Sequence, residues 1–291
     1  MFKQTKVWLA VTIVLSLLAL GTSCGPRTPT DGDATPSATT KVYKSPGNEG
    51  TVSGTIAYNG TPPPPKKIDS SADPVCAQNN PNLTTEDVVA KEGKLANVFV
   101  YIKDGTLADG SKFADYTWDV PSTAVTLDQQ GCHYKPHVLG VQANQVVRIT
   151  NSDPTQHNIH PTPKFNEEWN QTQPNGAAPL EKKFARPEVL IPVKCNQHPW
   201  MKAYVGVLKH PYFAISGEDG TFTLKAPPGK YTVAAWHEKG GPNGTEKTMQ
   251  VTVPASGSVK ADFAFGDAAA ASNSGGLQMM PALELPMIGK H

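Results

Sequence analysis

The chain contains the loop Cys195-Asn196-Gln197-His198-Pro199-Trp200-Met201, in which a thiolate, an imidazole and a thioether recur at steps of three residues. All three groups bind soft or borderline metal ions, and copper accepts each of them. The apolar run at 189–193 is typical of a β-strand, which would hold the cysteine rigidly where the strand ends. Pro199 restricts the loop further. The stretch therefore predicts a metal site at the end of a strand.

A copper site of this composition needs a second histidine from another part of the chain. His157 and His160 both follow a polar turn after the strand-like run at 146–150. If the segment after the turn is extended, His157 and Ile159 face one side while Asn158 and His160 face the other. Only one histidine then points at the metal. We favour His157, with His160 as the rival.

The Cys-x2-His-x2-Met loop, with proline after the histidine, resembles the amicyanin-type cupredoxins, as does the separate His-Asn-x-His segment at 157–160. The resemblance implies that one mononuclear type 1 (blue) copper ion is bound by His157, Cys195, His198 and Met201. It also implies that Asn158 ties the two ligand segments together by hydrogen bonds. The chain departs from this family by inserting residues 161–183 between the ligand segments, so the redox partner protein cannot be carried over.

Zinc and no metal are the alternatives to copper at this loop. A Cys-x2-His pair can be half of a zinc site, but structural zinc sites use four Cys or His ligands and rarely a thioether. We find no Ser-His-Asp signature, phosphate loop or nucleotide fingerprint. Four protein ligands would leave copper no open position for a substrate. The sequence therefore favours a carrier over an enzyme.

The first residues indicate export. Lys3 and Lys6 precede an apolar run over 7–20, and small residues then lead to Cys24. This order is typical of a secretory signal peptide, here 1–23, and the run is shorter than the roughly 20 apolar residues that span a membrane. Cys24 resembles the lipidated cysteine of bacterial lipoproteins, although Gly21 stands where that motif usually has leucine. Ordinary cleavage nearby, leaving a soluble secreted protein, is the alternative.

The charge of the chain bears on its partners. The formal net charge is +1, and removal of Lys3 and Lys6 with the signal would make it −1. Because no long basic stretch exists, nucleic acid is not expected as a partner. The expected partners are a redox partner protein and a membrane, reached through the N-terminal lipid anchor.

Two cysteines remain once Cys24 and Cys195 are assigned. Thiols tend to pair in an oxidising compartment, so we expect a Cys76–Cys132 disulfide. Two buried free thiols are the alternative.

The folded region reads as all-β. Alternating apolar residues bounded by Gly, Pro and Asn clusters recur along it, and no amphipathic helix is evident after the signal. The strand-like segments include 51–58, 98–102, 222–224, 231–235, 249–253 and 259–265. Such short strands with frequent turns predict sandwiches or barrels.

Two stretches at the ends of this region resemble carboxypeptidase-regulatory-like domains, which are transthyretin-like sandwiches. They are 50–56 and 217–233, and the second includes the turns Asp219-Gly220 and Pro228-Gly229. We therefore expect a cupredoxin Greek-key sandwich inserted in, or joined to, a transthyretin-like one. The expected parts are a tether at 24–50, the carboxypeptidase-regulatory-like sandwich at 51–118 plus 213–266, the copper domain at 119–212 and a low-complexity tail at 267–291. Two consecutive domains with a boundary near Phe213 are the alternative.

The combined prediction is an extracytoplasmic, membrane-anchored lipoprotein, in the periplasm or at the cell surface, that carries single electrons. Copper binding or delivery without electron transfer is one alternative. An accessory carbohydrate-binding or adhesion sandwich is another, and it rests on fold analogy alone. His133 and His137 could form a second metal site, but ordinary hydrogen-bonded histidines are favoured there.

Overall fold

The computed structural model describes residues 41–239 and 244–266. The expected signal peptide, Cys24, the first part of the tether and the tail at 267–291 lie outside the described residues. Among the residues it describes, no helix has the length and apolar character needed to cross a membrane. The chain is all-β as predicted, with strands in several sheets and two short helices within the described ranges.

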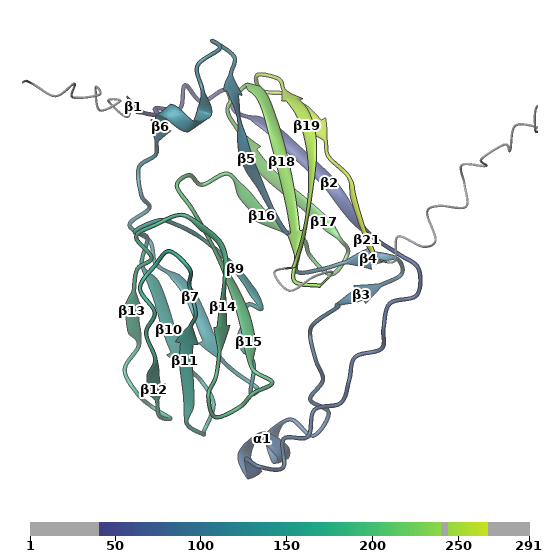
Figure 1. Cartoon of the computed structure of the whole chain (residues 1–291), viewed down its shortest axis with the longest axis vertical. Coiled ribbons are helices and arrows are strands. Elements are labelled where there is room, and N and C mark those ends of the chain that lie inside the picture. Colours follow the sequence, from purple (N-terminus) through teal and green to yellow (C-terminus); the bar gives the residue numbers. More distant parts are fainter. Residues whose placement is uncertain (1–40, 240–243, 267–291) are drawn as a thin grey trace, which may run out of the picture. The chain divides into compact units, whose positions relative to one another are not determined.

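The outer sandwich is built from both ends of the described chain (Figure 1). Its first sheet has the order β16 (Phe213–Ile215), β5 (Phe99–Leu107), β18 (Gly229–His237) and β19 (Thr245–Val253). Its second sheet has the order β17 (Thr221–Ala226), β2 (Gly50–Asn59), β4 (Lys94–Leu95) and β3 (Ala90–Lys91), with β20 (Ser258–Lys260) and β21 (Phe263–Gly266) also paired with β2. Two further elements belong to this part of the chain. They are a two-stranded sheet of β1 (Lys41–Val42) and β6 (Tyr116–Thr117) and the 3-10 helix η1 (Phe113–Asp115).

The two predicted turns serve as corners between these sheets. Asp219-Gly220 connects β16 to β17, and Pro228-Gly229 connects β17 to β18, so each turn takes the chain from one sheet to the other. Gly220 has φ +71°, a conformation that glycine adopts without steric cost, and the Asp219 carboxylate accepts from the Thr221 N–H at 2.9 Å. The alternating strands on either side then bury one face each against a shared core.

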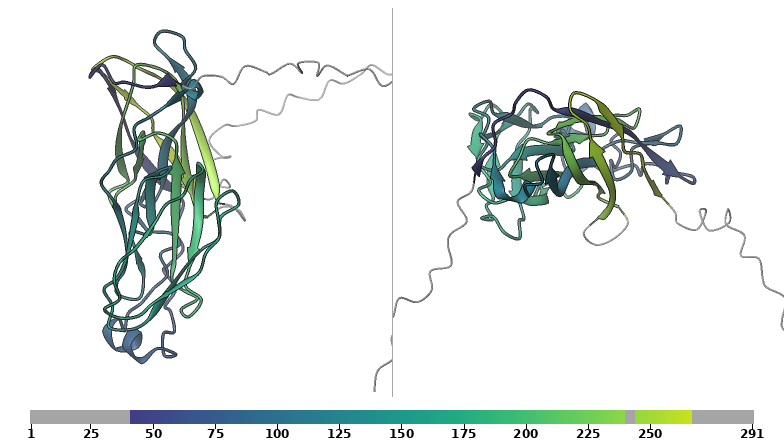
Figure 2. Two further views of the ribbon diagram at one scale, coloured as in Figure 1. Left: turned by 90° about the vertical axis from the view of Figure 1, so that its left-hand side faces the viewer. Right: turned by 90° about the horizontal axis from the view of Figure 1, so that it is seen from above.

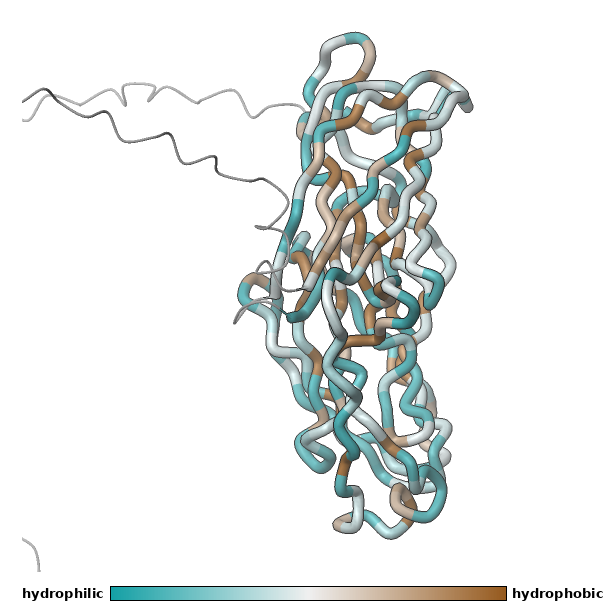
Figure 3. Tube along the Cα trace, turned by 90° about the vertical axis from the view of Figure 1, so that its right-hand side faces the viewer, coloured by the Kyte–Doolittle hydropathy of each residue, from teal (hydrophilic) through white to brown (hydrophobic). Residues whose placement is uncertain are grey.

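The inner sandwich contains β7 to β15. One sheet has the order β13 (Leu180–Lys182), β10 (Val147–Asn151), β7 (Val125–Gln129) and β8 (Tyr134–Lys135). The other has the order β12 (Gln171–Gln173), β11 (His157–Pro161), β14 (Glu188–Lys194), β15 (Lys202–Leu208) and β9 (Val138–Gln142). The segment at 161–183 thus adds β12 to one sheet and β13 to the other. Hydrophobic residues lie mainly between the sheets (Figure 3).

The strand pairing interleaves the two sandwiches along the chain. β2 and β5 precede the inner sandwich, and they pair with β17 and β18, which follow it. An apolar cluster contains residues of both sandwiches, among them Phe99 and Trp236 from the outer one and Val138 and Leu208 from the inner one. The domain boundaries at 119 and 212 stay predictions, as does the transthyretin-like assignment of the outer sandwich.

One element was not expected from the sequence. Between β2 and β3 the chain leaves the outer sandwich and forms the six-residue helix α1 (Pro74–Asn79), whose N-terminus is capped by the Asp73 carboxylate. A disulfide joins Cys76 of α1 to Cys132, with the two Cα atoms 5.8 Å apart. Figure 1 and the left view of Figure 2 place α1 beyond the strand ends of the inner sandwich. Six residues are too few for helical periodicity to be visible in the sequence.

Candidate metal centre

The predicted donor residues come from two places in one sheet of the inner sandwich. His157 begins β11, Cys195 directly follows β14, and His198 and Met201 lie in the loop between β14 and β15. Because β11 pairs antiparallel with β14, with His160 opposite Lys194, the start of β11 runs beside the loop that follows β14. The structure therefore brings together residues that are about 40 positions apart in the sequence.

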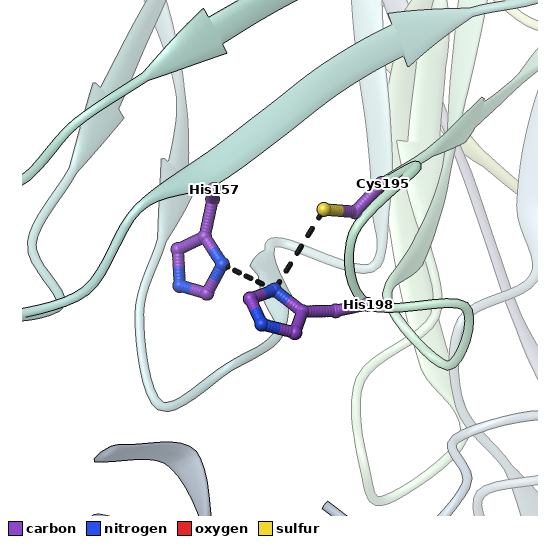
Figure 4. A group of neighbouring side chains, drawn as sticks. All are labelled: His157, Cys195 and His198. Carbon is purple, nitrogen blue, oxygen red and sulfur yellow. Dashed lines mark hydrogen bonds between the residues drawn. The ribbon is translucent and has the colours of Figure 1, made fainter. Parts of the chain in front are cut away.

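Three donor atoms converge at this end of the sheet (Figure 4). The Nδ1 atoms of His157 and His198 are 2.9 Å apart, and the Cys195 Sγ atom lies 3.8 Å from His198 Nδ1. One donor atom from each of the three residues lies within 4.8 Å of the others, and all three residues are buried. A group of two imidazoles and one thiol is the equatorial set that copper(II) accepts.

The loop is closed by its own backbone. The Cys195 N–H donates to the Met201 carbonyl at 3.3 Å, and the Met201 N–H donates to the His198 carbonyl at 2.9 Å. Met201 is fully buried in the same hydrophobic cluster as Cys195. The cysteine, histidine and methionine are thus held in one short, closed turn.

The Nε2 atom of each histidine ring contacts a carboxylate, so the Nδ1 atom is the one that faces the other donors. His157 Nε2 lies 2.8 Å from an Asp153 carboxylate oxygen, and His198 Nε2 lies 2.9 Å from an Asp73 oxygen. A neutral imidazole that donates from Nε2 keeps a lone pair on Nδ1. In the metal-free site the two Nδ1 atoms share one hydrogen bond at 2.9 Å, and a metal ion would take the place of the shared proton. The residues therefore fit a copper ion, which His157, Cys195 and His198 would hold.

The site also lowers the pKa of the thiol. Burial alone would raise the pKa of Cys195, but hydrogen bonds from His157 and His198 lower it to about 6. Burial alone would lower the pKa of His157, but its contacts with Asp153 and Cys195 raise it to about 9. A thiolate is therefore available near neutral pH, which is the form that binds metals.

Asn158 connects the two donor segments. Its side-chain oxygen accepts from the Asn196 N–H at 3.0 Å, which joins β11 to the residue after Cys195. Its side-chain NH2 donates to the Asn170 side chain, and its carbonyl accepts from the Tyr134 hydroxyl. These contacts correspond to the role expected for Asn158.

His160 lies outside the donor group. Its ring nitrogens contact Asn196 Oδ1 at 3.0 Å and Glu168 Oε1 at 2.7 Å. The alternation along β11 therefore turns His157 inward and His160 toward polar partners.

Three further histidines, His133, His137 and His210, lie in other surroundings. His210 packs among aromatic rings, and His137 contacts Glu238 at 2.5 Å and Glu86 at 3.5 Å. His133 Nδ1 lies 3.3 Å from the same Glu86 carboxylate oxygen. Among the described residues, the donor groups compact enough for a metal include none of these three histidines.

Sequence reasoning missed Asp73 and Asp153. Each is followed by proline, so the Asp-Pro dipeptides at 73–74 and 153–154 were a local turn signal. Asp153 is also four residues before His157. Nothing local to Asp73 indicates that it contacts a histidine 125 positions away.

Comparisons with known proteins give likenesses to solved structures of copper proteins, and these likenesses cover only part of the chain. No family model matches it, and no curated protein does. Among solved structures, a copper-containing nitrite reductase from Thermus scotoductus SA-01 is 19% identical with a TM-score of 0.28, and the match covers 30% of this chain and 23% of that one. An amicyanin variant in its reduced Cu(I) form is 22% identical with a TM-score of 0.26, and the match covers 31% and 86%.

A purple cupredoxin from Nitrosopumilus maritimus is 21% identical with a TM-score of 0.25, and the match covers 28% of this chain and 98% of that one. All three TM-scores are below 0.5. The assignment of the site therefore rests on its own geometry.

Proposed function

We propose that the chain binds one mononuclear copper ion through His157, Cys195, His198 and Met201 and serves as a one-electron carrier. The observation that carries the proposal is the convergence of three buried donor atoms, two imidazole nitrogens and a thiol sulfur, within 4.8 Å of one another. Copper in such a site supplies a reversible Cu(I)/Cu(II) couple. The protein's part is to hold the donors in one arrangement for both states.

Several contacts of the donors support this role. The closed loop at 195–201 and the link from Asn158 to Asn196 restrict movement of the donors. Burial of all three keeps water from the centre. An arrangement that changes little between oxidation states suits electron transfer better than substrate turnover.

Absorption spectroscopy of the full chain after addition of Cu(II) tests the proposal. We expect an intense visible band from charge transfer between the Cys195 thiolate and copper. Cys195→Ser should abolish this band, since a hydroxyl cannot supply the same transition. A colourless wild-type chain that takes up zinc as readily as copper would rule out the electron-carrier function.

The anchor is a separate part of the proposal. We propose that the chain is exported and held at a membrane by a lipid on Cys24, with a redox protein as its partner. Cys24→Ser should then move the protein from the membrane fraction to the soluble fraction after cell breakage. Retention of the variant in the membrane fraction would mean that something other than lipid on Cys24 holds it.

A further inference from the structure

Both imidazoles of the candidate copper centre are held from behind by carboxylates. Asp153 Oδ2 lies 2.8 Å from His157 Nε2, and Asp73 Oδ2 lies 2.9 Å from His198 Nε2. Each histidine therefore faces an anion on the side away from the other donors.

The same carboxylates bind the backbone of the disulfide cysteines. The Cys132 N–H donates to Asp153 Oδ2 at 2.8 Å, and the Cys76 N–H donates to Asp73 Oδ1 at 3.2 Å. The Cys76 sulfur lies within 4.8 Å of donor atoms of Asp73 and His198. The Cys132 sulfur lies within 4.8 Å of donor atoms of Asp153 and His157. The Cys76–Cys132 bond thus closes a chain of contacts from one histidine to the other.

The segment at 68–83, which we call the cap segment, brings Asp73 to the centre from outside the inner sandwich. The Thr155 hydroxyl donates to Asp73 Oδ2 at 2.9 Å, and the Asn80 side chain donates to the Gly131 carbonyl at 3.0 Å. The Trp200 indole donates to the Cys132 carbonyl at 3.1 Å. His198 is only 4% exposed in this arrangement.

We propose that Asp73 and Asp153 are positioning residues of the copper centre, and that the Cys76–Cys132 disulfide fixes the cap segment so that Asp73 can act on His198. The inference rests on the proposed function. A carboxylate that accepts from Nε2–H fixes the ring tautomer and leaves Nδ1 free for the metal. The loss of such a partner typically reduces metal affinity by about 10- to 100-fold.

The two anions also favour the more highly charged oxidised copper. Negative charge close to a redox centre stabilises the state with the larger positive charge, and the effect is strong where water is excluded. Removal of one carboxylate should therefore raise the reduction potential. A purely structural role for Asp73 would not shift the potential in this defined direction.

Asp73→Asn is a selective test because the two carboxylate oxygens have different tasks. Oδ1 accepts from the Val75 and Cys76 N–H groups and caps α1, and asparagine caps helices well. At the Oδ2 position, asparagine would present an NH2 group to the Nε2–H of His198. The helix cap remains, and the contact with the histidine is lost.

We expect full-length Asp73→Asn to retain the visible band, to bind copper about 10- to 100-fold more weakly and to have a higher reduction potential. In the metal-free protein, NMR should show a His198 Nε2–H that exchanges slowly in the wild type and rapidly in Asp73→Asn. Asp69→Asn is the matched control, because it removes a carboxylate from the same cap segment that accepts from the Ser71 N–H at 3.0 Å. This control should match the wild type in copper affinity and in His198 exchange.

Paired substitutions test the disulfide. Cys76→Ala with Cys132→Ala should weaken copper binding in the same direction as Asp73→Asn. Adding Asp73→Asn to this pair should then have less effect than in the wild type, because the two changes act on one contact. If the disulfide-free variant fails to fold, Asp73→Asn and Asp69→Asn decide the positioning role by themselves.

The outcomes separate the two proposals. A wild-type chain without the thiolate–copper band overturns the proposed function. A wild type with the band, in which Asp73→Asn and Asp69→Asn have equal potentials and equal copper affinities, overturns the positioning role and leaves the copper function standing. Full additivity of Asp73→Asn and the disulfide substitutions overturns the part assigned to the disulfide.

Discussion

The residues of the candidate centre differ in how readily their roles can be predicted from the sequence. Cys195, His198 and Met201 lie in one loop, so their spacing alone indicates a metal site. His157 could be chosen over His160 only by assuming a strand, and the structure forms that strand as β11, with His157 buried and His160 partly exposed. Asp73 could not be found in this way, because its contact with His198 depends on the folding of a distant segment. Local spacing predicts donors, whereas groups that position them depend on tertiary structure.

Substitution of each histidine of β11 tests the assignment of the second imidazole. His157→Ala should abolish the visible band, because it removes one of the three converging donors. His160→Ala should leave the band largely intact, since its ring contacts Asn196 and Glu168 instead. Absorption spectra of the two copper-treated variants provide the measurement. The reverse pattern would make His160 the ligand.

At the scale of elements, β5 shows why alternation in the sequence can understate burial. The residue pattern predicts a strand at 98–102 but does not indicate which of its faces are buried. In the structure Val100 and Ile102 enter the core of the outer sandwich, while Phe99 and Tyr101 pack in the cluster shared with the inner sandwich. Both faces are covered because a second sandwich lies against the sheet. The residue pattern of a strand predicts the strand itself, but it does not predict which part of the protein packs on each of the strand's faces.

Gly206 in β15 tests this packing. A Cβ atom at Gly206 would lie 2.6 Å from the Phe99 ring, closer than van der Waals contact allows. Gly206→Ala should therefore lower the free energy of unfolding by about 1–3 kcal/mol, as measured by urea denaturation. Phe99→Leu in the same chain should recover part of this loss, because leucine lacks the outer ring atoms. Additive losses in the double variant would show that the two residues do not meet.

At the scale of the whole described chain, the sequence anticipated an all-β sandwich fold but not the cap segment. The alternating strands and the Asp-Gly and Pro-Gly turns marked the sheets, because these signals are local. The cap segment has little regular structure beyond α1, and contacts with the inner sandwich hold it in place. The expected disulfide is the one feature of this connection that cysteine usage could indicate.

A charged cluster also connects parts of the chain that are far apart in sequence. His137 precedes β9 of the inner sandwich, Glu238 follows β18 of the outer sandwich, and Glu86 precedes β3. Burial alone would lower the pKa of His137, but its hydrogen bond with Glu238 and the nearby Glu86 carboxylate raise it to about 9. The other titratable groups around this cluster include His133, His237, Lys135, Asp87, Lys202, Lys239 and Tyr204.

This cluster predicts a loss of stability at alkaline pH. Because the folded pKa of about 9 lies above the unfolded value of about 6.5, protonated His137 stabilises the fold fully below pH 6.5. The contribution, at most about 3 kcal/mol, is lost as the pH rises through 9. His137→Gln should flatten the fall in unfolding free energy between pH 6.5 and 9 in urea titrations. His133→Gln is the matched control, because burial lowers the pKa of His133, so that it is already neutral across this range. Equal slopes in the wild type and His137→Gln would show that His137 does not carry the proton in the folded protein.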